Sequence, residues 1–193
     1  YHLYQETYDP EAYLRTHRSG GKREMASRLE APRRAAEAGF TYVGMGVLLG
    51  LADLKNDVTG LAAHASILQE EVPGLQVGFS LPRVQTMDAD PAYSPARPVS
   101  DEDFVRSMLF LRLAHPSAHL TLTTREAPAI RDLSLALGVS KLSAGVSTAP
   151  GGYVATAEDE ETGARAQFDV ADERSVDEIA ALVSEAGLTP VFD

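Results

Sequence analysis

TYVGMGVLLG (residues 41–50) and LQVGFSLPR (residues 75–83) are the two stretches that decide the fold class. Each is an apolar run broken mainly by glycine, which is typical of a buried strand. The residues between them have an apolar face at helical spacing, made of Leu54, Val58, Leu61, Ala62, Ala65 and Leu68. Two buried strands joined by a helix predict a parallel βαβ unit with a right-handed crossover.

The same alternation extends over most of the chain. Strands are predicted at residues 1–6, 41–49, 75–82, 119–125 and 140–147. Helices are predicted at residues 22–38, 54–72, 100–113, 127–137 and 175–187. Asp9-Pro10 is interpreted as a turn, and residues 85–99 are interpreted as a loop. Pro32 is expected to divide or kink the first helix, and Ser175 with Glu178 forms a capping box for the last. Two α/β architectures fit this pattern: about strands 4 to 8 of a (β/α)8 TIM barrel, or a flavodoxin-like doubly wound sheet.

Composition narrows the possible functions. The chain has 193 residues and a net charge of 17 minus 28, or −11, which argues against a nucleic-acid partner bound by a basic face. The sequence has no apolar run of the roughly 20 residues that a membrane span needs. It also contains no cysteine, so thiolate metal sites and cysteine nucleophiles are absent from these residues. We therefore expect no metal site in this chain, and a cytoplasmic location.

Polar side chains gather where the predicted strands end, the edge at which both architectures bind ligands. The residues at or near these ends are Glu6, Gly44, Gly46, Arg83, Arg125, Ser143 and Ser147. Two arginines and a carboxylate suit a zwitterionic ligand, because guanidinium groups pair with carboxylates in a bidentate manner. Salt bridges at loop ends are the alternative interpretation. The five histidines share no spacing typical of a metal site, and EDEE (158–161) is interpreted as a solvated turn.

Several stretches, in their order and spacing, carry a family resemblance: YQETYDPEAY, SRLEAPRRAAEAGF, GMGVLLGLADLKND, FSLPR, LTTREAPAIRD, KLSAGVSTAPGGY and QFDVADERSVDEIAALVSEAGLTPVFD. Together they resemble the C-terminal part of the radical S-adenosylmethionine aromatic amino-acid lyases, and most of all the tyrosine lyases of thiamine synthesis. The resemblance implies a (β/α)8 barrel with a 4Fe-4S cluster on a CxxxCxxC loop and S-adenosylmethionine as cofactors. It further implies cleavage of the Cα–Cβ bond of tyrosine to 2-iminoacetate (dehydroglycine) and p-cresol.

The resemblance also implies roles for individual residues at the cofactor. Glu6, in QET, corresponds to the carboxylate that holds the ribose or amino group of S-adenosylmethionine. Arg28, in SRLEAP, corresponds to the arginine that pairs with the methionyl carboxylate of this cofactor. Gly44 and Gly46 would let their strand approach the adenosyl portion. Glu6 and Arg28 would thus clamp opposite ends of one ligand.

Three further residues are assigned to the substrate by the same resemblance. Arg125, in TTRE, and Ser143, in LSAG, correspond to groups that hold the carboxylate of the amino-acid substrate. Arg83, in LPR, is a looser candidate for this pocket. The catalytic residues themselves stay unassigned.

The chain departs from the family in lacking the cysteine loop and the first three strands, so we expect residues 1–193 alone to be inactive. Because the sequence begins with Tyr1, it is interpreted as the remainder of a longer chain. We expect residues 1–150 to form the second half of a barrel and residues 151–193 a C-terminal biotin- and thiamine-synthesis-associated extension. Expected partners are tyrosine and thiazole synthase. A tryptophan-cleaving relative, a hydrogenase-maturation relative and a non-catalytic half-barrel binding module remain alternatives.

Overall fold

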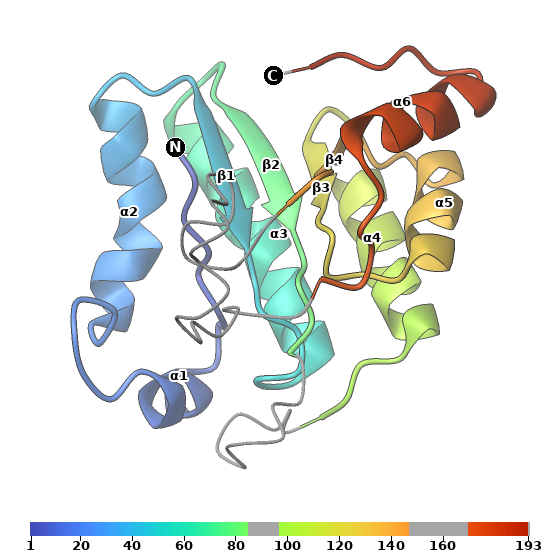
Figure 1. Ribbon diagram of the computed structural model, residues 1–193. Coiled ribbons are helices and arrows are strands. Elements are labelled where there is room, and N and C mark those ends of the chain that lie inside the picture. Colours follow the sequence, from blue (N-terminus) through green and yellow to red (C-terminus); the bar gives the residue numbers. More distant parts are fainter. Residues whose placement is uncertain (85–96, 147–169, 193) are drawn as a thin grey trace, which may run out of the picture.

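The computed structural model describes residues 1–84, 97–146 and 170–192, and its elements alternate as the sequence predicts (Figure 1). The strands are β1 (Tyr42–Gly46), β2 (Gln76–Ser80), β3 (His119–Leu122) and β4 (Lys141–Leu142). The helices are α1 (Pro10–Thr16), α2 (Met25–Glu37), α3 (Leu54–Glu71), α4 (Asp101–Ala114), α5 (Pro128–Ala136) and α6 (Val176–Glu185). The capping box of Ser175 and Glu178 at the start of α6 is confirmed.

The four described strands are parallel and lie in the order β1-β2-β3-β4. Each strand therefore pairs with the next one along the chain, and the order never reverses within the described part. A doubly wound sheet reverses its strand order at the point where ligands bind. The sheet is consequently parallel α/β, as predicted, and its order disagrees with the flavodoxin-like alternative.

The main core lies between the sheet and the helices that cover one of its faces (Figure 1). Alternate residues of β1 and β2, such as Val43, Met45 and Phe79, enter this core because successive strand side chains point to opposite faces. Leu61 of α3 and Leu111 of α4 pack against them and are fully buried. The opposite face of β1 carries its glycines, and the side chains of His2 and Tyr4 lie against them.

Residues 1–6 do not form the predicted strand but an extended segment beside β1. Isolated parallel bridges join His2 to Gly44 and Glu6 to Val47. Between these bridges, the Gln5 side chain replaces a regular ladder hydrogen bond. Its Oε1 accepts from the Gly46 amide at 3.2 Å, while its Nε2 donates to the Leu3 carbonyl at 3.0 Å. The prediction of a regular strand was wrong because a side-chain amide occupies the place of a backbone pair.

Three further predictions differ from the structure. Asp9 and Pro10 were interpreted as a turn, yet they begin helix α1: the Asp9 carboxylate accepts from the Ala12 amide at 2.8 Å, and Pro10 stands at the first helical position. Pro32 lies buried inside α2 without dividing it. Strand β4 has two residues where a strand at 140–147 was predicted.

Some predictions fall outside the described residues. These are the loop expected at 85–99 over residues 85–96, Ser147 with the end of its predicted strand, the EDEE turn and the domain division at 150/151. They stay predictions.

Gly46→Ala should lower the free energy of unfolding by about 1–3 kcal/mol, the usual cost of overpacking. A Cβ at this position would lie 2.4 Å from the Ser80 carbonyl oxygen and 2.9 Å from the Tyr4 ring, and a backbone oxygen within a sheet cannot easily move away. Gly21→Ala is the matched control, since a Cβ there meets nothing within 4 Å. Urea denaturation of both variants measures the difference, and equal stabilities would contradict the packing described for β1.

Candidate functional site

The sequence-predicted carboxylate and cofactor arginine are in direct contact. An oxygen of Glu6 (Oε1) lies 2.7 Å from Nη2 of Arg28, and the two side chains are only 12% and 9% exposed. The Nε of Arg28 also donates to the Tyr4 carbonyl at 2.5 Å, and Lys22 approaches Glu6 at 3.5 Å. The two residues expected to hold opposite ends of one ligand thus contact each other, and they present a carboxylate and a guanidinium side by side at the end of the N-terminal segment. A clamp around a cofactor stays a prediction.

Arg125 belongs to the same electrostatic environment. It follows β3 and is half-buried, and burial lowers the pKa of its guanidinium. The negative charges of Glu126 and Glu6 and the phenol of Tyr4 oppose this shift in the pKa of Arg125. Arg125 thus lies within electrostatic range of Glu6, although the two residues are far apart in the sequence.

Arg83 is held by carboxylates of the chain itself. It forms an ion pair with buried Glu126, with an Nε to Oε2 distance of 3.0 Å, and another with Asp101 at 2.7 Å. Burial alone would lower the pKa of Arg83, but the hydrogen bonds that Arg83 donates to these carboxylates outweigh it and raise that pKa. Its guanidinium also lies over the Phe104 ring, 4.9 Å from the centroid. The geometry supports a role in fixing Glu126 beside Arg125, and a substrate contact by Arg83 stays a prediction.

Ser143 follows β4, and its backbone is fixed on both sides. Its amide donates to the Leu122 carbonyl at 3.1 Å, and its carbonyl accepts from fully buried Arg131 of α5. Arg131 forms an ion pair with Asp172, whose carboxylate also binds Arg174 at 2.6 Å. This ionic network joins α5, the backbone at Ser143 and the segment before α6.

Gly44 and Gly46 have a packing explanation. A Cβ on Gly44 would lie 2.0 Å from the His2 ring, and Gly46 faces Ser80 and Tyr4 as described above. Neighbours from the chain itself account for both glycines, and contact with a cofactor stays a prediction.

Sequence reasoning missed several buried polar groups that organise this edge. These are Gln5, Asp57, Glu126, Arg131 and Asp172. Each lies within one of the quoted motifs, so membership in these motifs was the available signal. Their partners lie up to 50 residues away in the sequence, and only the tertiary structure identifies them.

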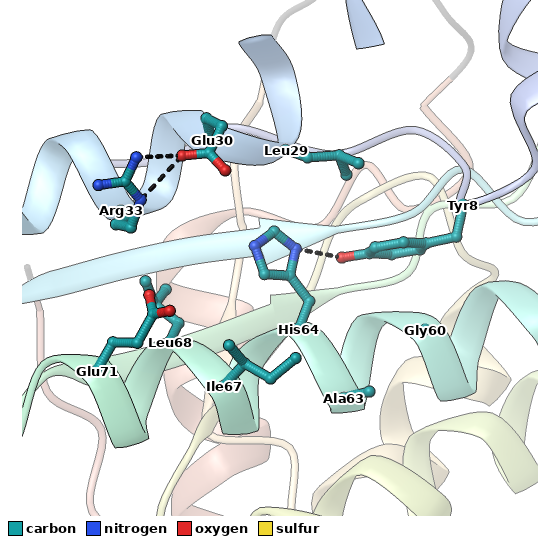
Figure 2. A pocket seen from close by; sticks show the side chains of 10 residues that line it. All are labelled: Tyr8, Leu29, Glu30, Arg33, Gly60, Ala63, His64, Ile67, Leu68 and Glu71. Carbon is teal, nitrogen blue, oxygen red and sulfur yellow. Dashed lines mark hydrogen bonds and ion pairs between the residues drawn. The ribbon is translucent and has the colours of Figure 1, made fainter. Parts of the chain in front are cut away.

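One cavity lies away from the strand ends. It measures about 340 Å³ and lies between α2 and α3, where its lining includes Tyr8, Arg33, His64 and Ile67 (Figure 2). A smaller hollow at the carboxyl ends of β2 and β3 is lined partly by Ser80, Thr123 and Glu126.

Among the described residues, no cluster of His, Asp and Glu could hold a metal ion. No helix in the described part is long and apolar enough to cross a bilayer.

The chain is an α/β protein built of consecutive parallel βα units, and it carries a charged cluster at the carboxyl edge of its sheet. Proteins of this class bind their ligands at that edge. The protein-family model of the Biotin and Thiamin Synthesis associated domain matches residues 80–189. The chain belongs to this family.

Known relatives extend the similarity over nearly the whole chain. It is 34% identical over 191 residues to 2-iminoacetate synthase of Escherichia coli (strain K12), covering 98% of this chain and 49% of the relative. The synthase of Salmonella typhimurium is 32% identical with the same coverage. The chain thus spans about half the length of the curated relatives it matches.

Solved structures give the same result. The crystal structure of HydG, a maturase of the [FeFe]-hydrogenase, is 35% identical with a TM-score of 0.88, over 100% of this chain and 41% of that chain. HydG from Carboxydothermus hydrogenoformans is 34% identical with a TM-score of 0.84, over 100% and 42%. The resemblance identified from the sequence motifs is confirmed by these similarities.

Proposed function

We propose that these residues form the cofactor- and substrate-holding part of a radical S-adenosylmethionine lyase. In the complete protein, this lyase would cleave the Cα–Cβ bond of tyrosine to give 2-iminoacetate and p-cresol for thiazole synthesis. One observation carries the proposal: in a chain 34% identical to a 2-iminoacetate synthase, Glu6 and Arg28 form a largely buried ion pair.

The ion pair fits the polar groups of S-adenosylmethionine. The Arg28 guanidinium suits the methionyl carboxylate, and the Glu6 carboxylate suits the ammonium group or the ribose hydroxyls. Among the described residues, Arg28 and Lys22 both contact Oε1 of Glu6, which leaves Oε2 for a ligand donor. When bound at a reduced 4Fe-4S cluster, S-adenosylmethionine supplies a hydrogen-abstracting radical. Since the 193 residues contain no cysteine, we propose that the cluster's thiolates belong to another part of the complete protein.

The substrate carboxylate is assigned to Arg125 and Ser143. A half-buried guanidinium binds a carboxylate more strongly than an exposed one, because the surroundings screen the charges less. Glu126, held by Arg83, lies next in sequence to Arg125 and can bind the substrate ammonium or keep the arginine oriented. These groups would orient the amino-acid end of tyrosine for removal of a hydrogen atom.

Further parts of the proposal rest on the family resemblance. The sheet would supply about strands 4 to 8 of a (β/α)8 barrel, and its sequential parallel order supports this. Residues 1–150 would form the barrel part and residues 151–193 the extension. Gly44 and Gly46 would border the adenosyl portion. Thiazole synthase would be the protein partner, in the cytoplasm.

Product analysis tests the proposed function. With reconstituted cluster, S-adenosylmethionine and a reductant, the complete protein should convert tyrosine to equal amounts of p-cresol and 2-iminoacetate. Residues 1–193 alone should give neither product, because they supply no cysteine ligands. Turnover of tryptophan but not tyrosine would contradict the assigned substrate. No turnover of either amino acid by cluster-loaded protein would contradict a lyase function and favour a binding module.

A further inference from the structure

Glu6 adopts an uncommon backbone conformation. Its φ angle is 71°, and it is the one non-glycine residue with positive φ in the described part of the chain. A left-handed conformation is unfavourable for a residue with a side chain, because its Cβ approaches a backbone oxygen. Such a conformation persists only where the surrounding structure fixes it, and it is common at functional sites. The structure should therefore contain groups that hold residue 6 in place.

The residues after Glu6 are anchored to the first turn of α3. Oδ1 of Asp57 accepts a hydrogen bond from the Thr7 hydroxyl at 2.7 Å and another from the Tyr8 amide at 2.7 Å. Asp57 is 1% exposed and Thr7 is fully buried. Further along, the Tyr8 hydroxyl lies 2.8 Å from Nδ1 of His64, at the cavity between α2 and α3 (Figure 2).

The residues before Glu6 are anchored to β1. The Gln5 amide donates to the Gly46 carbonyl at 2.8 Å, and its fully buried side chain bonds Gly46 and Leu3 as described above. Backbone and side-chain hydrogen bonds thus fix both neighbours of Glu6. The carbonyl of Glu6 itself accepts from the Leu48 amide at 2.8 Å.

We infer that Asp57 and Gln5 are positioning residues: they hold Glu6 in its left-handed conformation and thereby direct its carboxylate toward Arg28 and the cofactor. Neither residue needs to touch the cofactor for this role. The inference rests on the proposed function, since it takes Glu6 as the carboxylate that binds S-adenosylmethionine.

The test measures the dissociation constant of S-adenosylmethionine with the complete, cluster-loaded protein. Asp57→Ala should weaken binding by about 10–100-fold, the range seen when groups that orient metal-binding residues are removed. Asp57→Asn keeps an acceptor for Thr7 and Tyr8 and should restore affinity to within about 3-fold of wild type. Asp53→Ala is the matched control. Asp53 caps the same helix through the Asn56 amide at 3.1 Å, so its loss should reduce stability and leave affinity unchanged.

A double-mutant cycle separates positioning from a general structural effect. In a Glu6→Gln background, Asp57→Ala should weaken binding by less than about 3-fold, because residues that act through one another are not additive. The inference would be overturned if the effects of Glu6→Gln and Asp57→Ala on the binding free energy were fully additive. Wild-type affinity of Asp57→Ala would overturn it as well. Wild-type affinity of Glu6→Gln alone would instead overturn the cofactor assignment in the proposed function. The two failures are therefore distinguishable.

Discussion

Arg28→Ala is expected to weaken S-adenosylmethionine binding by the complete protein about 100-fold or more, and to lower its free energy of unfolding by about 2–4 kcal/mol. The variant removes the group assigned to the methionyl carboxylate and leaves Glu6, only 12% exposed, without its nearest cation. Removing one partner of a buried ion pair costs about 3–5 kcal/mol, and Lys22 at 3.5 Å offsets part of this. Isothermal titration with cofactor and thermal unfolding measure the two effects.

Arg33→Ala is the matched control on the same helix. Arg33 bonds Glu30 through Nε at 2.9 Å and also contacts Glu37, but these side chains are 41–55% exposed. Exposed ion pairs contribute about 0–1 kcal/mol, so stability should change little and cofactor affinity should stay as in wild type. An equal loss of affinity in both variants would contradict the assignment of Arg28.

Asp172→Ala is expected to lower the free energy of unfolding by about 3–5 kcal/mol. Asp172 and Arg131 are both fully buried, so the variant leaves a guanidinium without a counter-charge inside the protein. It also releases Arg174 from a 2.9 Å hydrogen bond between Nε and Oδ1. Glu102→Ala removes an exposed ion pair with Arg106 and serves as the control, with an expected change below about 0.5 kcal/mol. Equal effects of the two variants, measured by urea denaturation, would contradict the role of this network.

The pH dependence of stability gives a second measurement on the same carboxylate. Hydrogen bonds from Arg174, together with the charge of Arg131, outweigh burial and lower the pKa of Asp172 from 3.8 to about 2. Its stabilising contribution is present above about pH 4 and is lost as the pH falls toward 2, because the unfolded carboxylate binds a proton first. The stability difference between wild type and Asp172→Asn should shrink over this range. A constant difference would contradict the lowered pKa.

Much of the fold could be predicted because it depends on local patterns. The apolar runs at 41–50 and 75–83 and the helical face between them are properties of contiguous residues, and the structure places β1, α3 and β2 there. Residues 1–6 were harder to predict, because their backbone pairing is altered by the Gln5 side chain. A sequence pattern carries no information on whether a side-chain amide takes the place of a backbone partner.

The site was predictable as a set of residues and less so as a set of contacts. Residues at strand ends share one edge, and Glu6 lies in contact with Arg28 and within electrostatic range of Arg125. The partners of Arg83 could not be predicted, because Glu126 is 43 residues away and its burial depends on the completed sheet. The left-handed backbone of Glu6 was also unpredictable, since its anchor Asp57 belongs to another helix.

A crystal structure of the complete protein with S-adenosylmethionine is the most direct test of the central claim, that the Glu6–Arg28 pair is the cofactor site. We predict that Arg28 lies within hydrogen-bonding distance of the methionyl carboxylate, and Glu6 within that distance of the ribose hydroxyls or the ammonium group. Bound cofactor whose polar groups contact neither Glu6 nor Arg28 would contradict the claim.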